Sequence, residues 1–189
     1  MNGQPITDQT RDAYRQHFSM VFSDFYLFDT LVGLNNDHNN DALDVQAQEY
    51  LDKLQLRGSV EIKNGALSST AVSQGQRKRL ALLTSYLEDR PIYVFDEWAA
   101  DQDPVFKEVF YLQLLPELRA KGKTIIAISH DDRYYYVADR IIKLDYGKIE
   151  YDRDITNFSE TFRWETFNQL SSAESRTERG AILKLVAEM

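Results

Sequence analysis

The stretch SQGQRKRLALLTSYLEDRPIYVFDE, residues 73–97, joins a predicted helix to a predicted buried strand. Ser73 at the N-cap and Gln76 three residues later form an S-x-x-Q capping box, which predicts a helix from Ser73 to about Asp89. Pro91 ends that helix, and the four apolar residues after it lead into two carboxylates. Such a short apolar run is typical of a strand that is buried on both faces. A helix followed by a strand of this kind indicates an α/β protein.

The same alternation continues toward the carboxyl terminus. Asp103 and Pro104 are an N-cap and first residue for a helix that Pro116 is expected to kink or split. KTIIAISH, residues 123–130, is the next apolar strand, and RIIKLDYGKIEY, residues 140–151, alternates as a hairpin. Helices and apolar strands in this order predict parallel core strands, with functional side chains at the carboxyl ends of those strands.

The two ends of the chain carry weaker patterns. The aromatic-rich residues Phe18–Phe22 predict a strand, and residues 42–56 have nearly helical apolar spacing. The regular pattern is lost in residues 152–189. We expect that segment to be a C-terminal extension, partly a mobile linker, which leads to a short terminal helix.

Composition excludes several classes of protein. The 189 residues are 43% hydrophobic, enough for one domain with a core or for a large fragment of a bigger one. The formal net charge of −8 argues against nucleic acid as a partner, because an acidic surface repels phosphates. The sequence has no cysteine, so disulfide frameworks and thiolate metal sites are excluded.

Two interpretations of the helix start at Ser73 remain open. The capping box explains Ser73 and Gln76, but Gly75 inside the first turn costs about 1 kcal/mol relative to alanine. The cations of residues 77–79 also crowd the positive end of the helix dipole. A phosphate bound at this helix start would explain both features, because Gly75 lets an anion approach the backbone closely.

Polar side chains at the ends of the two apolar strands form the second candidate site. Asp96 and Glu97 either mark where the strand leaves the core, or they hold Mg²⁺ and polarise an attacking water. His130 ends the next strand and is either structural or a neighbour of these acids. Asp131 and Asp132, directly after it, are candidates for orienting its ring.

Four motifs in order, VSQGQRKRL, IYVFDE, DQDP and ISHDD, resemble the ATP-binding cassette family. The resemblance covers about residues 18–151. It implies a partial P-loop NTPase domain of that family over residues 1–151, with parallel core strands. Its helical subdomain would be residues 24–72, and its signature-to-switch region residues 73–151.

The resemblance also assigns roles to single residues. The signature motif at the start of the helix would meet the γ-phosphate of ATP held by a partner subunit, through Ser73, Gln74, Gly75 and Gln76. Asp96 and Glu97 match the Walker B pair, which implies Mg²⁺ at Asp96 and catalysis by Glu97. Asp103 matches the D-loop aspartate and His130 the switch histidine.

Two features depart from the family pattern. Ser23 stands where the family has a glutamine that contacts the metal and a water. The family's Walker A strand and loop, which grip the nucleotide phosphates, are not found before Phe18, and the G-K-T of residues 122–124 lacks the rest of that motif. We therefore expect Mg-ATP to bind weakly or not at all, and the chain to be inactive alone.

The resemblance implies ATP hydrolysis coupled to export, and the wording of the motifs is similar to the exporter branch associated with cyclic peptides and siderophores. It implies ATP and Mg²⁺ as cofactors. The implied partners are a second nucleotide-binding domain and a transmembrane exporter domain, which would hold this chain at the cytoplasmic face of the membrane.

Three alternatives stay open at this point. The chain is a non-hydrolytic subunit that lends its signature motif to a partner's ATP, or it is a gene remnant without independent activity. A chromosome-maintenance ATPase shares the same motifs, but such proteins carry long coiled coils, and the segment between Ser23 and Ser73 is short and lacks heptads.

Overall fold

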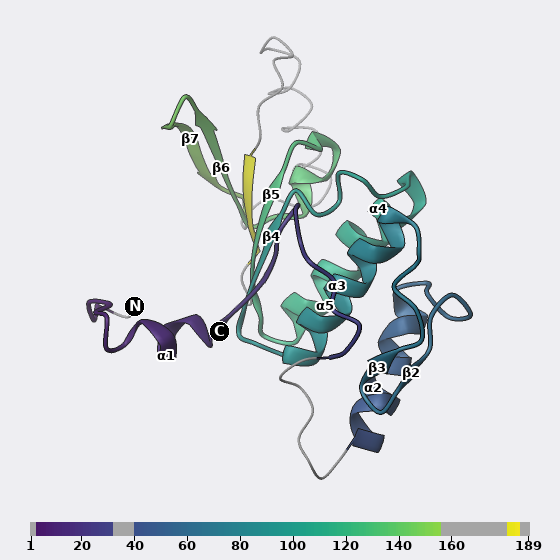
Figure 1. The fold of residues 1–189 in the computed structure, drawn as a ribbon. Coiled ribbons are helices and arrows are strands. Elements are labelled where there is room, and N and C mark those ends of the chain that lie inside the picture. Colours follow the sequence, from purple (N-terminus) through teal and green to yellow (C-terminus); the bar gives the residue numbers. More distant parts are fainter. Residues whose placement is uncertain (1–2, 32–39, 156–180, 186–189) are drawn as a thin grey trace. The chain divides into compact units, whose positions relative to one another are not determined.

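The computed structural model describes residues 3–31, 40–155 and 181–185. The chain divides into two compact units, Met1–Arg90 and Pro91–Met189. The elements of the first unit are α1 (Arg11–Arg15), β1 (Phe18–Val21), α2 (Asn40–Lys53), β2 (Ile62–Lys63), β3 (Ala66–Leu67) and α3 (Gln74–Glu88). Those of the second are β4 (Ile92–Asp96), α4 (Pro104–Val109), η1 (Phe110–Leu114), α5 (Leu115–Ala120), β5 (Thr124–Ser129), η2 (Asp132–Val137), β6 (Arg140–Asp145), β7 (Lys148–Asp154) and β8 (Ala181–Leu185) (Figure 1).

The first unit is built on the packing of α2 against α3. The rings of Tyr50 and Tyr86 stack with centroids 4.9 Å apart. Leu51, Leu54 and Leu82 are fully buried between the elements of this unit. The predicted helix of residues 73–89 is confirmed, and its C-cap, Asp89, takes the left-handed conformation before Pro91.

A short hairpin follows α2 and was not predicted. Ile62 pairs with Leu67 and Lys63 with Ala66 in the antiparallel strands β2 and β3. Asn64 and Gly65 between them both have positive φ angles, as a tight hairpin turn requires. The carboxylate of Asp44 in α2 accepts hydrogen bonds from both turn amides, at 2.6 and 2.9 Å. The Asn-Gly pair was the sequence signal for this turn.

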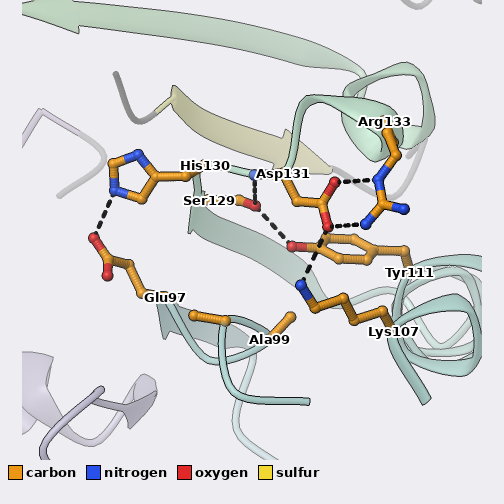
Figure 2. A pocket seen from close by; sticks show the side chains of 9 residues that line it. Glu97, Ala99, Lys107, Tyr111, Ser129, His130, Asp131 and Arg133 are labelled. Atoms are coloured by element: carbon orange, nitrogen blue, oxygen red, sulfur yellow. Dashed lines mark hydrogen bonds and ion pairs between the residues drawn. The ribbon is translucent and has the colours of Figure 1, made fainter. Parts of the chain in front are cut away.

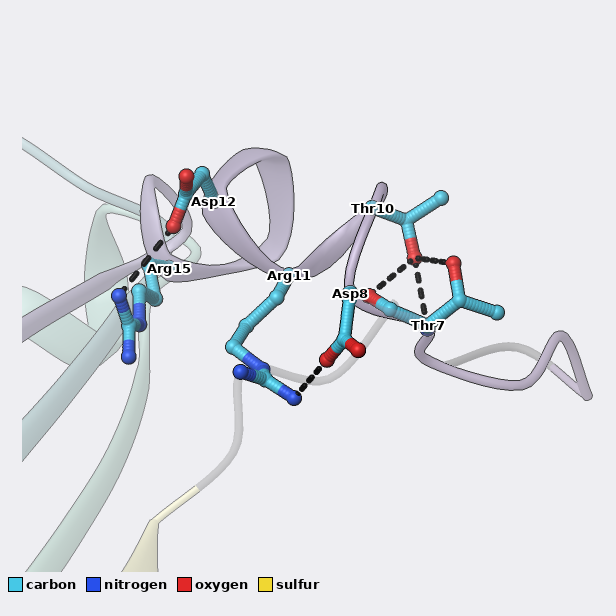
Figure 3. Close-up of polar contacts among 6 residues, drawn as sticks. All are labelled: Thr7, Asp8, Thr10, Arg11, Asp12 and Arg15. Carbon is cyan, nitrogen blue, oxygen red and sulfur yellow. Dashed lines mark hydrogen bonds and ion pairs between the residues drawn. The ribbon is translucent and has the colours of Figure 1, made fainter.

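Exposed polar contacts organise the segment around α1 (Figure 3). The hydroxyl of Thr10 accepts a hydrogen bond from the backbone N–H of Thr7 at 3.0 Å. Arg11 pairs with Asp8, and Arg15 lies 3.2 Å from Asp12. Exposed pairs of this kind contribute little to stability, so this segment is held mainly by local turns.

The second unit is a sheet in which the strands lie in the order β4-β5-β8-β6-β7. β4 and β5 pair in parallel, with Asp96 opposite Ile128, as predicted. Tyr93 and Phe95 are buried on one face of β4, whereas the alternate positions are partly exposed. The expectation of burial on both faces is therefore wrong for the second face.

The helical segment of residues 104–120 lies beside this sheet (Figure 1). Asp103 caps it, as predicted, by accepting a hydrogen bond from the N–H of Phe106 at 2.9 Å. Its middle, η1, is a π-helix, directly before the turn that contains Pro116. Phe110 in η1 packs on Phe95 and Trp98, with centroids 5.3 and 4.4 Å away. This aromatic cluster is the core of the second unit.

In the carboxyl-terminal part of the sheet, one prediction is confirmed and one is wrong. β6 and β7 form the predicted hairpin, with positive φ angles at Tyr146 and Gly147. β8 was expected to be helical, but it is a strand that pairs antiparallel with both β5 and β6 (Figure 1). Its backbone groups hydrogen-bond to strands distant in sequence, a pairing that local helix signals cannot anticipate. Most of the predicted C-terminal extension, residues 152–189, lies outside the described residues.

The predicted subdomain boundaries and the predicted lack of a Walker A strand stay predictions. Within the parts of the chain that the structure describes, no helix has the length and apolar character needed to cross a bilayer.

Candidate functional site

The carboxyl ends of β4 and β5 bring Glu97 and His130 together. The Nε2 atom of His130 lies 2.8 Å from Oε1 of Glu97 (Figure 2). Both side chains remain accessible, with 49% of His130 and 42% of Glu97 exposed. The predicted proximity of the histidine to the acids is thus confirmed for Glu97. A carboxylate and an imidazole at hydrogen-bond distance and open to solvent can accept and donate protons.

Glu97 is held in an unusual backbone conformation. Its φ angle is +48°, a left-handed value that disfavours residues with a Cβ atom. Its N–H donates to the carbonyl of Ile128 in β5 at 3.1 Å. The chain therefore turns sharply at the end of β4 and projects Glu97 over the end of β5. Strained conformations of this kind persist where the surrounding structure enforces them, often at functional sites.

Asp96, the candidate Mg²⁺ ligand, is the last residue of β4 and is partly exposed. The described residues contain no group of three or more histidine or acidic side chains arranged to hold a metal ion. A single carboxylate fits a Mg²⁺ ion that arrives with a nucleotide, because Mg²⁺ is usually bound by one or two carboxylates, phosphate oxygens and water.

A cavity of about 330 Å³ opens beside the Glu97–His130 pair. Its walls come from the two strand ends, the helical segment and η2, and they are lined by Glu97, Ala99, Ala100, Lys107, Tyr111, Ser129, His130, Asp131 and Arg133 (Figure 2). Charged groups of both signs therefore surround the space next to the pair.

Asp131 is the centre of an ion cluster in this cavity. Arg133 donates two hydrogen bonds to its carboxylate, at 2.9 and 2.8 Å, and Lys107 lies 3.4 Å away. Burial alone raises the pKa of Asp131, but the hydrogen bond and charge of Arg133, with the charge of Lys107, bring its pKa below the ordinary value. The expectation that Asp131 orients the ring of His130 directly is not met, because its carboxylate contacts these two cations.

Tyr111 and Ser129 close the inner wall of the cavity. Their hydroxyl oxygens lie 2.8 Å apart, and Tyr111 stacks on Tyr134 with centroids 4.3 Å apart. Burial raises the pKa of Tyr111 to about 12, with further upward contributions from Asp131 and Tyr134 against the lowering effect of the Ser129 hydrogen bond. Tyr111 therefore stays a neutral hydroxyl at physiological pH.

The second candidate site lies in the first unit, at the start of α3. Ser73 Oγ accepts from the N–H of Gln76 at 3.3 Å, and Gln76 Oε1 accepts from the N–H of Ser73 at 3.0 Å. The capping-box interpretation is confirmed. Arg77 donates to the carbonyl of Thr70 at 3.2 Å.

The neighbouring cations do not crowd the open end of the helix. Lys78 and Arg79 are buried, with 1% and 9% of their surface exposed. Ser73 and Gln74 are exposed and Gly75 is partly exposed, so this helix start faces solvent. Phosphate binding by Ser73, Gln74, Gly75 and Gln76 stays a prediction.

Comparison with known proteins identifies the family. The family model described as ABC transporter matches residues 1–100. The chain belongs to the ABC transporter family. It is 54% identical over 153 residues to the ATP-binding protein SyrD of Pseudomonas syringae pv. syringae, a match that covers 80% of this chain and 27% of SyrD. It is 31% identical over 156 residues to the ATP-dependent lipid A-core flippase of Bordetella pertussis (strain Tohama I / ATCC BAA-589 / NCTC 13251), covering 77% of this chain and 24% of that protein.

A third relative is the probable syringafactin export ATP-binding/permease protein SyfD of Pseudomonas syringae pv. syringae (strain B728a). The match has 29% identity over 160 residues and covers 80% of this chain and 23% of SyfD. The chain thus spans about a quarter of the length of these relatives.

Solved structures show the same fold. The dimeric ATP-binding cassette MJ0796 in a post-hydrolysis state, bound to ADP and Pi, aligns with a TM-score of 0.66 at 22% identity, covering 81% of this chain and 69% of that one. The expected α/β fold of an ABC ATPase is therefore confirmed.

In this ABC transporter chain, the second unit unites Asp96, Glu97 and His130 at two adjoining strand ends. Asp103, from the same unit, serves as the N-cap of α4, and its D-loop role stays a prediction. Ser23 is exposed in a turn after β1 of the first unit, and its role at the metal stays a prediction.

Sequence reasoning missed most of the cavity wall, including the polar side chains of Lys107, Tyr111, Ser129 and Arg133. Ser129 directly precedes His130 at the end of an apolar strand, which was a usable signal. Lys107 and Tyr111 come from the capped helical segment, and Tyr111 lies in the π-turn, for which the sequence gives only the indirect signal of Pro116.

Proposed function

We propose that this chain is part of the ATP-hydrolysing domain of an ABC exporter. The observation that carries the proposal is the 2.8 Å contact between Glu97 and His130 at the ends of two parallel strands. In an open α/β sheet this is the edge at which ligands bind. A purely structural histidine is normally buried and satisfied, whereas His130 is half exposed beside an exposed carboxylate.

The residues divide the work of phosphoryl transfer among them. Bound Mg-ATP supplies the transferable phosphoryl group and the metal charge. Glu97 would orient and deprotonate the attacking water, and His130 would hold the Glu97 carboxylate in place. Asp96 holds the Mg²⁺ ion, directly or through water. Asp103 keeps the segment after Glu97 in position as the cap of α4.

The start of α3 serves a second nucleotide-binding domain. Its partial positive charge favours an anion, and Ser73 offers a hydroxyl at the exposed end of a helix of 15 residues. We propose that Ser73, Gln74, Gly75 and Gln76 contact the γ-phosphate of ATP bound by that partner. The dimeric state of the MJ0796 cassette supports this arrangement.

The transmembrane partner is proposed to dock on an apolar surface of the first unit. A cavity of about 430 Å³ lies between the segment of residues 20–31 and α3. Phe22, Tyr26 and Phe28 on its rim are 47%, 76% and 57% exposed, an unusual concentration of open aromatic surface. We assign an apolar segment of the exporter's membrane domain to this surface. The name of SyfD, an ATP-binding/permease protein, supports a partner of that kind.

We further propose that the exported cargo is a cyclic peptide, as the residues of the motifs indicate by their resemblance to the exporter branch. The similarity to the probable syringafactin export protein SyfD supports export as the activity, and the residues of the motifs support the peptide class. Such a function places the chain at the cytoplasmic face of the membrane.

A chimera tests the catalytic proposal. The 153-residue matched part of SyrD is replaced by the corresponding part of this chain, and Mg-dependent ATP hydrolysis by the purified chimera is measured. We expect hydrolysis, and we expect Glu97→Gln to lower its rate by about 100-fold or more, as loss of a general base does. Glu108→Gln, at an exposed position in α4, is the matched control and retains the rate.

The same chimera separates the alternative function. If the chain only lends its signature motif, the chimera shows no Mg-dependent ATP hydrolysis, with or without Glu97→Gln, because Glu97 is the only Walker B glutamate that the replaced segment supplies. That pattern would reject catalysis by Glu97 and favour the lending subunit.

A further inference from the structure

The residues on both sides of His130 are held by buried hydroxyl groups. Ser129 Oγ lies 2.8 Å from the Tyr111 hydroxyl and accepts a hydrogen bond from the N–H of Asp131 at 3.0 Å. The carbonyl of Ser129 accepts a hydrogen bond from the Tyr135 hydroxyl at 2.8 Å. Tyr111 and Tyr135 are almost fully buried. The backbone that enters and leaves His130 is therefore fixed to the helical segment and to η2 (Figure 2).

The ion cluster fixes the same backbone a second time. Arg133 grips the Asp131 carboxylate through two nitrogens, a geometry that restricts the orientation of the carboxylate as well as its distance. Lys107 reaches the same carboxylate from α4 at 3.4 Å. These contacts tie Asp131, the residue after His130, to α4 and to η2.

The contact between His130 and Glu97 is too weak to hold the ring by itself. Both side chains are more than 40% exposed, and exposed ion pairs contribute only about 0.2–1 kcal/mol. That energy is similar to the cost of freezing the two side chains, so the pair gains little from its own hydrogen bond. The position of the ring must come from the backbone to which it is attached.

A π-turn explains how Tyr111 reaches Ser129. The N–H of Leu115 donates to the carbonyl of Phe110, five residues earlier, which is the π-helical pattern. Pro116 follows directly and has no N–H to offer to an α-helical ladder. The extra residue in this turn rotates α5 relative to the helical residues before it. Tyr111 can therefore point toward β5 although it belongs to a helical segment.

We propose that Tyr111, Ser129 and Asp131 are positioning residues that set the ring of His130 against Glu97. The proposal rests on the catalytic role assigned above to His130, and it adds a means by which an exposed ring keeps one orientation. None of the three needs to touch the nucleotide. Their effect passes through the backbone of residues 129–131 to the imidazole.

The test uses the full chain with ring-labelled histidine and measures the nitrogen and carbon chemical shifts of His130 by NMR. The sequence contains three histidines, so His130→Gln assigns the signal. At a pH where imidazole is neutral, the Glu97 carboxylate accepts from Nε2–H and thus favours that tautomer. We expect Tyr111→Phe to shift the His130 signals toward those of a free imidazole that exchanges between tautomers.

Tyr134→Phe is the matched control, because it removes one hydroxyl from the ring stacked on Tyr111 and leaves the hydrogen bonds to Ser129 in place. We expect its His130 signals to match the parent protein. Arg133→Gln removes the ion pair that holds the Asp131 carboxylate. Because Arg133 is 59% exposed, this substitution leaves the core intact and can be used even if Tyr111→Phe does not fold. It is expected to shift the His130 signals in the same direction.

Unchanged His130 signals in the folded Tyr111→Phe and Arg133→Gln proteins would overturn the proposal. A drop in melting temperature without a change at His130 would likewise assign Tyr111 a purely structural role. The readout is ring orientation, which does not depend on ATP turnover. A failure of the proposed hydrolysis in the chimera therefore remains distinguishable from a failure of this positioning network.

Discussion

Oε1 of Glu97 lies 2.8 Å from Nε2 of His130, although 33 residues separate the two in sequence. The register of β4 on β5 explains this proximity, because Asp96 stands opposite Ile128 and the N–H of Glu97 bonds to the carbonyl of Ile128. The turn after Asp96 then carries Glu97 over the strand end, at the cost of a left-handed backbone. The relationship between the two side chains is thus produced by backbone geometry.

We predict that, because of backbone strain at position 97, a glycine variant is more stable than an alanine variant, the reverse of the usual order in a helix. At a φ angle of +48°, Glu97→Gly should have a free energy of unfolding about 1 kcal/mol higher than Glu97→Ala, because glycine has no Cβ to strain. Urea denaturation of the two variants measures the difference. Glu108 in α4 is the control, where glycine should be about 1 kcal/mol less stable than alanine. An alanine variant as stable as the glycine variant at position 97 would contradict the argument.

The capping box at Ser73 gives a second prediction about stability. Ser73→Ala removes the acceptor for the N–H of Gln76 and should lower the free energy of unfolding by about 1 kcal/mol. Ser73→Asp keeps an acceptor at this position and should retain most of the stability. If the start of α3 also receives a phosphate, the aspartate variant of the chimera loses ATP hydrolysis while its fold stays intact, because the added charge repels the anion. Equal stability of all three proteins would show that the cap contributes nothing.

Features encoded by neighbouring residues could be predicted from the sequence. The capping box of Ser73 and Gln76 and the N-cap at Asp103 depend on side chains within one turn of the backbone that they satisfy. The apolar runs of β4 and β5 and the hairpin turn at residues 145–147 are equally local. The Asn64–Gly65 turn was available by the same logic and was overlooked.

Features that depend on distant partners could not be predicted. β8 is a strand because β5 and β6 provide backbone hydrogen-bond partners on either side of it. The sequence of β8 alone does not encode this pairing. Tyr111 enters the site only through the π-turn and the stacking on Tyr134. Glu97 and His130 were predicted to be neighbours since both end apolar strands, but their direct contact depends on the turn at Glu97, which no sequence pattern marks.

The aromatic core of the second unit gives a prediction about packing. Phe110 is 1% exposed and lies against Phe95 and Trp98, so Phe110→Ala leaves a cavity among rings that cannot collapse into it. We expect a loss of about 3–5 kcal/mol in the free energy of unfolding. Val105→Ala, at a position in α4 that is 66% exposed, should change it by less than about 0.5 kcal/mol. Similar effects of the two substitutions in urea denaturation would mean that Phe110 does not occupy the core.

The last prediction concerns alkaline pH and the buried hydroxyl of Tyr111. Burial raises the pKa of Tyr111 to about 12 in the folded chain, whereas an exposed tyrosine in the unfolded chain titrates near about 10. Between these values the unfolded state has lost its proton and the folded state has kept it, so the free energy of unfolding falls as the pH rises. The slope from one such group is at most about 1.4 kcal/mol per pH unit. Tyr111→Phe removes this group and should flatten the decline between pH 10 and 12, measured by urea denaturation at a series of pH values. Tyr146→Phe, at a position that is 94% exposed, should leave the decline as it is in the parent protein. If the Tyr111 and Tyr146 variants lose stability with the same slope, the Tyr111 hydroxyl titrates like an exposed one, and the argument from its burial fails.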